Sequence, residues 1–160
     1  MKTIKNILIT GCSSGIGKNA ALTLHYKGWR VFATCRSEKD CLFFKKLGIE
    51  SFPLDLFKED SINNAAEIIK NKTDSHLDAL YNNGAFAIPG AVQDMPREAL
   101  REIFEVNVFG QIDLINKCIP IMLSSENPRI INCSSVLGFI SLPYRGLYSA
   151  TKYSIEALTD

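Results

Sequence analysis

The sequence predicts an α/β fold in which a doubly wound parallel sheet of at least five strands carries helices on both faces. Short apolar segments rich in β-branched residues alternate with segments whose apolar residues recur every three or four positions. Glycine follows several of these segments and separates one from the next. Because strand, helix and strand join by a right-handed crossover, this alternation predicts parallel strands between two helical layers.

The first three elements are predicted from the spacing of apolar residues and from the glycines that end the segments. Residues 4–10 are short and mostly apolar and stop at Gly11, which predicts a strand. From Ile16 the apolar residues share one helical face, which predicts a helix that ends at Gly28. Residues 30–35 are again short and apolar and predict the second strand.

The next elements repeat this order. Residues 40–47 predict a short helix closed by Gly48, and residues 50–54 predict the third strand. Apolar residues at positions 62, 65, 66 and 69 follow the spacing of one helical face. Residues 77–81 predict the fourth strand.

The second half of the chain is more helical. Pro96 stands at a plausible first helical position, so residues 95–104 predict a helix. Residues 106–123 predict a long helix, interrupted at most by Pro120. Residues 129–133 predict the fifth strand, and a last helix is expected to begin between residues 144 and 148.

The composition fits one globular domain over residues 1–160. Apolar residues make up 46% and charged residues 22%, and the net charge is +1. This balance argues against nucleic acid or an anionic membrane as a partner. The helical pattern continues up to the last residue, so the domain is expected to be incomplete at its carboxyl terminus.

Cysteine and histidine usage indicates a cytoplasmic protein without a metal site. The five cysteines are odd in number and form no Cys-x-x-Cys pair, which favours reduced thiols. No apolar stretch approaches a secretory leader or a membrane span. His25 and His76 lie far apart and belong to no zinc-binding pattern.

The turn after the first strand has the spacing Gly-x-x-x-Gly-x-Gly and opens the first helix. Gly11 permits the tight turn, Gly15 leaves space for a pyrophosphate, and Gly17 lets the helix pack close to the sheet. The helix amino terminus offers free N–H groups to phosphate. This placement favours a Rossmann-type dinucleotide site over an ordinary capped turn. The residues expected to bind the cofactor here are Gly11, Ser13, Ser14, Gly15, Ile16 and Gly17.

The end of the second strand favours NADP(H) over NAD(H). An acidic residue at this place binds the ribose 2′-hydroxyl of NAD. Here Cys35 stands there and Arg36 follows. A guanidinium suits the 2′-phosphate of NADP because it makes bidentate, charge-assisted hydrogen bonds. The alternative is that Arg36 is a solvated loop cation.

Tyr148 and Lys152 are spaced Tyr-x-x-x-Lys, so they share one face of the last helix. A lysine ammonium stabilises phenolate and lets a tyrosine exchange a proton with a carbonyl or alcohol oxygen. Ser134 and Ser135 leave the fifth strand at its carboxyl end, where open α/β sheets bind ligands. The alternative role for these serines is a cap or a turn.

Together these motifs resemble the short-chain dehydrogenase/reductase family. The matching stretches share the family's order and gaps and extend over the whole chain: TGCSSGIG at 10–17, LD at 54–55, YNNGA at 81–85, Asn107, SS at 134–135 and YSATK at 148–152. The family usually reads Asn-Asn-Ala-Gly where this chain has Asn-Asn-Gly-Ala at 82–85. The backbone beside the cofactor is therefore expected to differ there.

The resemblance implies a catalytic tetrad of Asn107, Ser135, Tyr148 and Lys152, with Ser135 chosen over Ser134 by its spacing from the tyrosine. Ser135 would hold the substrate oxygen, and Tyr148 would act as general acid/base. Lys152 would bind the nicotinamide ribose, and Asn107 would keep a water connected to the lysine. The alternative role for Asn107 is to cap or bend its helix.

The resemblance also implies further contacts. Asp55 and Leu56 would edge the adenine, and Asn82 would line the cofactor cleft; Tyr148 and Lys152 would also touch the cofactor. An apolar substrate pocket is expected from Val136, Leu137, Phe139, Leu142 and Tyr144, with Phe86 and Ile88 opposite. It would take a small-molecule carbonyl or alcohol, and the region resembles the branch with steroid-type dehydrogenases and bacterial reductases.

Assembly is expected as a homodimer or homotetramer, because the family packs its long helix against symmetry mates. Apolar residues occupy several sides of residues 106–123, namely Val108, Ile112, Ile115, Ile119 and Met122. A non-catalytic nucleotide-binding or interaction protein is the alternative function. A sugar-nucleotide epimerase is less consistent with the glycine spacing. The 160-residue chain alone is expected to be poorly active.

Overall fold

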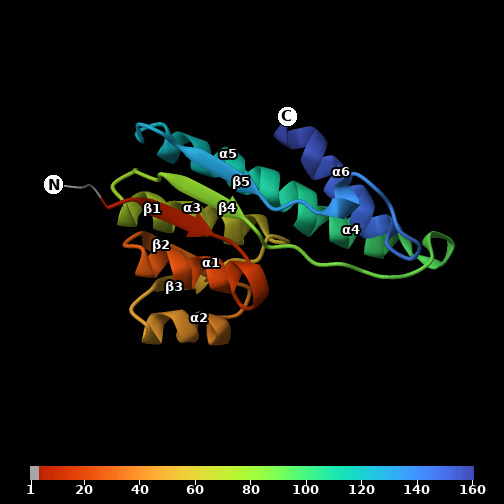
Figure 1. Ribbon diagram of the computed structural model, residues 1–160, viewed down its shortest axis with the longest axis horizontal. Helices are drawn as coiled ribbons and strands as arrows, with labels where there is room; N and C mark the ends of the chain where they lie inside the picture. The colour runs from red at the N-terminus through yellow and green to blue at the C-terminus, as the bar shows by residue number, and fades with distance from the viewer. Residues whose placement is uncertain (1–3) are drawn as a thin grey trace.

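The computed structural model describes residues 4–160 and contains one five-stranded parallel sheet in the order β3-β2-β1-β4-β5 (Figure 1). The strands are β1 Asn6–Ile9, β2 Arg30–Cys35, β3 Glu50–Pro53, β4 Ala79–Asn82 and β5 Arg129–Asn132. The predicted doubly wound α/β fold is confirmed. The order reverses at β1, so the carboxyl ends of β1 and β4 meet at the point where such sheets form a ligand crevice.

Helices connect the strands and flank the sheet. They are α1 Gly15–Tyr26, α2 Glu38–Lys46, α3 Glu59–Lys72, α4 Arg97–Phe104, α5 Gly110–Met122 and α6 Gly146–Thr159. Two short 3-10 turns are η1 Val92–Asp94 and η3 Val136–Gly138. No helix within residues 4–160 is long and apolar enough to cross a bilayer. A strand or helix is present in each segment where the sequence predicts one, and most of the bounds differ by a few residues.

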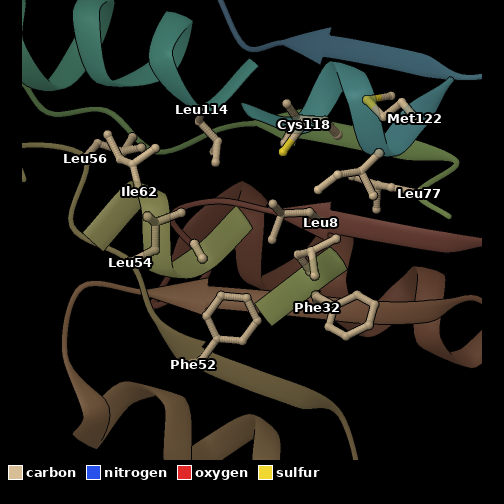
Figure 2. Close-up of a cluster of buried hydrophobic side chains, with 14 residues drawn as sticks. Leu8, Phe32, Phe52, Leu54, Leu56, Ile62, Leu77, Leu114, Cys118 and Met122 are labelled. Atoms are coloured by element: carbon tan, nitrogen blue, oxygen red, sulfur yellow. The ribbon is translucent and has the colours of Figure 1, made fainter. Parts of the chain in front are cut away.

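Two hydrophobic cores lie on opposite faces of the sheet because successive strand residues point to opposite sides. Leu8 belongs to the core that α3 and α5 cover, with Leu114 among its helical members (Figure 2). Ile7 and Ile9 belong to the other core, which α1 and α2 cover with Ala21 and other residues. Burial on both faces explains why β1 and β2 read as continuous apolar runs, whereas Ile130 and Ile131 of β5 are exposed.

The long helix differs from its prediction. Residues 95–104 and 106–123 were expected as two helices, but α4 continues into α5 through one π-helical turn, η2 Glu105–Phe109. Pro96 is the residue before α4 and not its first helical residue, and α5 runs through Pro120 to Met122. A π turn absorbs one extra residue without breaking the helix, so the apolar period alone does not reveal it.

All five cysteines are free thiols, and four of them are buried. Burial raises the pKa of Cys12 and of Cys118 to about 12 each. These thiols therefore stay protonated at neutral pH and act as small apolar side chains.

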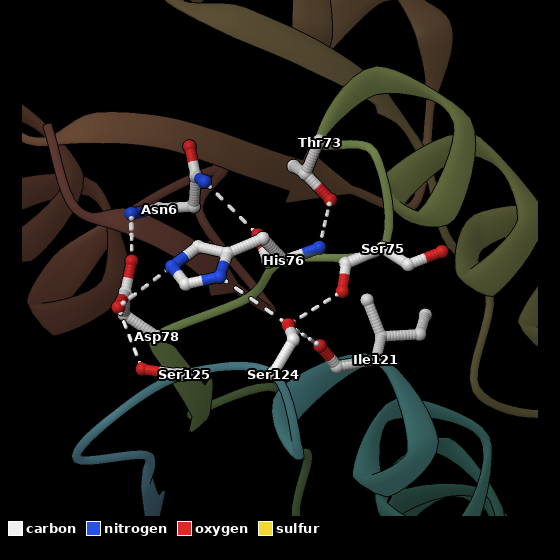
Figure 3. Close-up of polar contacts among 8 residues, drawn as sticks. All are labelled: Asn6, Thr73, Ser75, His76, Asp78, Ile121, Ser124 and Ser125. Carbon is white, nitrogen blue, oxygen red and sulfur yellow. Dashed lines mark hydrogen bonds and ion pairs between the residues drawn. The ribbon is translucent and has the colours of Figure 1, made fainter. Parts of the chain in front are cut away.

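A polar network lies at the amino-terminal end of the strands (Figure 3). The Asn6 N–H and the Ser125 hydroxyl donate to the two carboxylate oxygens of Asp78 at 2.7 Å each, and His76 Nε2 lies 3.2 Å from Oδ1. Ser124 Oγ lies 3.3 Å from Nδ1 of the same histidine. Burial opposes the charge of Asp78, but these partners outweigh it and hold the pKa of Asp78 below its usual value.

Replacing Asp78 by asparagine is expected to lower the free energy of unfolding by about 2 kcal/mol near neutral pH, because charge-assisted hydrogen bonds are lost. A lowered folded pKa means that the carboxylate stabilises the fold above its unfolded pKa of about 3.9 and ceases to do so as the pH falls. Urea unfolding at neutral and acid pH should therefore give a difference from wild type that shrinks in acid. Glu126→Gln, on an exposed carboxylate, is the control. A difference that is equal at both pH values would contradict this role.

Candidate active site

A cavity of about 790 Å³ lies at the carboxyl ends of the strands. It gathers residues from the β1–α1 turn, the end of β2 and the loops after β3 and β4. The predicted cofactor residues that line it are Gly11, Ser13, Ser14, Gly15, Ile16, Arg36, Asp55 and Leu56. Gly17 lies beneath, where an added Cβ would stand 2.5 Å from the Gly11 carbonyl oxygen. The carboxyl edge of the sheet thus brings together residues from four loops.

The glycine turn has the shape that a phosphate requires. Gly11 has φ +69°, and an added Cβ would stand 2.6 Å from the Gly84 Cα atom. Gly15 has φ +56° with open space at its Cβ position. Ser14 caps α1 without a side-chain hydrogen bond, so no side chain competes for the first N–H groups of the helix. These groups and the open cavity fit a dinucleotide pyrophosphate.

Asn83 braces this turn, and sequence reasoning missed it. Its side-chain amide donates to the carbonyls of Thr10 at 3.0 Å and Gly11 at 3.1 Å, and its backbone N–H donates to the Thr10 hydroxyl. Asn82, which was expected to line the cleft, is fully buried and donates to Asn132 Oδ1 at 3.0 Å. One sequence signal could have identified Asn83. It is the first residue after β4, in the loop that faces the β1 turn, whereas Asn82 is the last residue of the strand.

The Gly-Ala order after Asn83 has a steric reason. The Gly84 N–H donates to the Thr10 hydroxyl at 2.8 Å, and an added Cβ would stand 3.2 Å from that oxygen. Glycine thus lets the β4 loop approach the β1 turn closely. Ala85 follows as an exposed residue that lines the cavity.

Tyr148 and Lys152 lie on α6, as the spacing predicted. The Lys152 ammonium is buried, donates to the Cys133 carbonyl at 2.6 Å and lies 5.5 Å from the centroid of the Tyr148 ring. Burial lowers the pKa of Lys152, although the neighbouring Cys133 and Glu156 favour its charge. The lysine is therefore anchored at the end of β5 and beside the tyrosine.

The two serines after β5 differ in their partners. Ser135 Oγ accepts the Leu137 N–H at 3.1 Å and caps η3, which leaves its own proton free to donate. Ser134 Oγ is buried and has no hydrogen-bond partner among residues 4–160. The expected alternative role of a cap is therefore present at Ser135 and is compatible with binding a substrate oxygen.

Asn107 stands in the π turn and is fully buried. Its side chain accepts the Phe86 N–H at 3.0 Å and donates to the Phe86 carbonyl at 2.8 Å and to the Thr151 hydroxyl at 3.2 Å. The side chain thus ties the β4 loop to α6. The expected alternative was that Asn107 caps or bends its helix, and the residue lies in the π turn through which α4 continues into α5.

The residues before α6 expose apolar side chains beside these groups. Val136, Phe139, Leu142 and Tyr144 are each more than half exposed. The Tyr144 carbonyl accepts the N–H of Gly90, so the loop that carries Phe86 and Ile88, the expected opposite wall, contacts this segment at Gly90. An apolar surface therefore borders the Tyr148 end of α6.

A second cavity of about 670 Å³ continues from the first, and sequence reasoning missed its α4 wall. Arg36, Asp55 and Phe86 border both cavities, and α4 adds Glu98 and Arg101 to the second. Residues 4–160 hold no cluster of three or more His, Cys, Asp or Glu side chains suited to a metal ion.

The chain matches known proteins along almost its whole length. The model of the family described as short chain dehydrogenase matches residues 5–160. An uncharacterized oxidoreductase, YbbO, of Escherichia coli K12 is 38% identical over 98% of this chain and 58% of its own. A probable short-chain type dehydrogenase/reductase, VdlC, of Helicobacter pylori is 32% identical over 96% of this chain and 56% of its own.

A solved short-chain dehydrogenase from Streptomyces avermitilis superposes with a TM-score of 0.92 at 29% identity and covers 98% of this chain and 58% of that one. The chain thus spans little more than half the length of the relatives it matches. The family match over nearly every described residue agrees with the parallel sheet, the glycine turn and the Tyr-x-x-x-Lys helix. On this ground the chain belongs to the short-chain dehydrogenase family.

Proposed function

We propose that the protein is an NADP(H)-dependent oxidoreductase that interconverts a carbonyl compound and a secondary alcohol. The observation that carries this proposal is the Tyr148–Lys152 pair, whose lysine is anchored at 2.6 Å to the carbonyl of Cys133, two residues before Ser135. Family membership supports oxidoreductase chemistry. A non-catalytic binding protein would not require this pair, and NADPH oxidation with a panel of carbonyl compounds separates the two functions.

The cofactor would lie along the 790 Å³ cavity. The β1–α1 turn, with Gly11, Ser13, Ser14, Gly15 and Ile16, would hold the pyrophosphate, while Gly17 packs α1 against the sheet. When bound, the nicotinamide supplies or accepts the hydride.

Further cofactor contacts are proposed around this cavity. Asp55 and Leu56, which line the cavity, would border the adenine, and Tyr148 and Lys152, which lie on α6 outside its lining, would bind the nicotinamide ribose. Asn82 would contribute to cofactor binding from beneath the cleft. Its buried side chain binds Asn132 and so supports the end of β4, directly before Asn83.

The protein's own side chains would transfer the proton to and from the substrate oxygen. Ser135 would donate a hydrogen bond to the substrate oxygen with the proton that its cap leaves free. Tyr148 would give a proton to that oxygen during reduction and remove it during oxidation. Lys152 would stabilise the phenolate from its fixed position. Asn107 would position α6 through its hydrogen bond to Thr151 and keep a water connected to Lys152 as part of a proton path.

Arg36 is proposed to set the cofactor preference. Its exposed guanidinium borders both cavities, and Cys35 before it is buried and uncharged. Arg36→Asp is expected to raise the KM for NADPH at least about tenfold, since a charge-assisted phosphate contact becomes a repulsion. Steady-state kinetics with NADPH and NADH test this, and Arg97→Asp, outside both cavities as described, is the control. If the ratio of the KM for NADPH to the KM for NADH is unchanged in Arg36→Asp, the role of Arg36 is refuted.

The remaining expectations stand as proposals. Residues 1–160 would form one NAD(P)-binding domain of a cytoplasmic enzyme that binds no nucleic acid or membrane. Exposed Phe109, Ile119 and Leu123 on the long helix support a homodimer or homotetramer, whereas Val108 and Met122 are buried in this chain. Light scattering of the protein would test the assembly.

A further inference from the structure

We propose that the Thr151 hydroxyl is a positioning group that holds the catalytic tyrosine in register with its lysine. The inference rests on the proposed function, because it assumes that Tyr148 carries the proton. Thr151 itself touches neither cavity as described, and its hydroxyl acts through the backbone of Tyr148.

The hydroxyl of Thr151 joins two elements that meet only in the folded protein. The side chain is fully buried. Its Oγ1 donates to the Tyr148 carbonyl at 2.8 Å and accepts the Asn107 amide at 3.2 Å. One donor and one acceptor are therefore both paired, which a buried hydroxyl requires to avoid an energetic penalty.

The far end of this connection is the wall of the cofactor cavity. Asn107 binds both the N–H and the carbonyl of Phe86, at 3.0 and 2.8 Å, and Phe86 borders both cavities. A continuous run of hydrogen bonds thus leads from Phe86 through Asn107 and Thr151 to the Tyr148 backbone. Both ends are main-chain groups, so the run fixes backbone positions.

The register matters because the tyrosine and the lysine are anchored separately. Lys152 is held by Cys133 at the end of β5. Tyr148 lies on the first turn of α6, and Arg145, the cap of that helix, makes no side-chain cap hydrogen bond. Without the Thr151 hydroxyl, this turn loses its hydrogen bond to Asn107, whereas the Lys152 ammonium keeps its contact with Cys133, so we expect the tyrosine to move relative to the ammonium. Misplacement of a catalytic group by about 1 Å costs about a hundredfold in rate.

The variants separate the hydroxyl from the bulk of the side chain. Thr151→Val keeps the shape and removes both hydrogen bonds, whereas Thr151→Ser keeps both bonds and removes a methyl group. Ser149→Ala is the matched control, since Ser149 is buried on the same helix and its hydroxyl has no partner among residues 4–160.

Steady-state kinetics should show a split between kcat and KM. We expect Thr151→Val to lower kcat at least about tenfold with the KM for NADPH changed less than about threefold, and Thr151→Ser and Ser149→Ala to stay within about twofold. A purely structural role would lower the melting temperature without lowering kcat per folded molecule. Unchanged kcat in Thr151→Val, or an equal loss in Thr151→Ser, would overturn the proposal.

A second measurement does not depend on turnover. In protein labelled with 3-fluorotyrosine, the Tyr148 fluorine resonance is assigned by its loss in Tyr148→Phe. Thr151→Val is expected to shift this resonance, and Thr151→Ser and Ser149→Ala to leave it in place. An unshifted resonance in Thr151→Val overturns the positioning role even if the wild type proves inactive. Inactivity of the wild type with a shifted resonance would instead refute the proposed function alone.

Discussion

Replacing Tyr148 by phenylalanine is expected to reduce turnover by a factor of about a thousand or more, because a positioned general acid contributes about 10²–10⁴ in rate. The phenol is the group beside the buried Lys152 ammonium that can exchange a proton, and phenylalanine removes only that oxygen. Steady-state NADPH oxidation with a reducible carbonyl compound measures the loss. The affinity for NADPH, followed by its fluorescence, should change less than about threefold, since the glycine turn is untouched.

Two controls make this result specific. Tyr26→Phe removes a phenol that is 78% exposed on α1 and should leave turnover unchanged. Lys152→Met should lower turnover as well and also weaken cofactor binding, because the ammonium is proposed to serve both. Retained turnover in Tyr148→Phe would remove the tyrosine from the mechanism.

Replacing Gly11 by alanine is expected to lower the free energy of unfolding by about 3 kcal/mol, from left-handed backbone strain and overpacking together. The residue has φ +69°, and the new Cβ would meet the Gly84 Cα at 2.6 Å. That atom is backbone held by the hydrogen bond from Gly84 to Thr10, so it cannot easily yield. The displaced turn is also expected to weaken NADPH binding by at least about tenfold.

Gly28→Ala is the matched control for this prediction. Gly28 has φ +85°, which is also left-handed, but nothing lies within 4 Å of its Cβ position. It should therefore cost about 1 kcal/mol from strain alone and leave cofactor binding intact. Urea unfolding and NADPH titration of both variants give the comparison. Equal effects in the two variants would show that backbone strain, and not the approach of Gly84, explains the glycine at position 11.

Much of the fold could be predicted because its signals are local. The alternation of strands and helices depends on side-chain period within each segment, and β2 matches residues 30–35 as expected. The bounds of other elements shifted by a few residues because helix and strand ends depend on hydrogen bonds to neighbours. The π turn at η2 was not foreseen, since its extra residue leaves the apolar pattern of α4 and α5 readable as two helices.

In the candidate site, too, the features with local sequence patterns could be predicted and those that depend on distant partners could not. The glycine spacing and the Tyr148–Lys152 spacing are short-range patterns, and the structure places both at the carboxyl ends of the strands. Asn82 and Asn83 were harder to separate, because one position along the chain decides whether a side chain supports β4 or braces the β1 turn. Their partners, Asn132 and Thr10, lie 50 and 73 residues away.

The sequence by itself determined the fold class, the glycine turn and the shared helical face of Tyr148 and Lys152, because period, backbone freedom and i, i+4 spacing act within a few residues. Only the tertiary structure decided that Asn83 braces the turn and that Thr151 joins Asn107 to the tyrosine. Each of these hydrogen bonds needs two segments that are distant in sequence to be packed at about 3 Å. Such a distance results from the packing of the whole chain and leaves no mark on the local pattern of either segment.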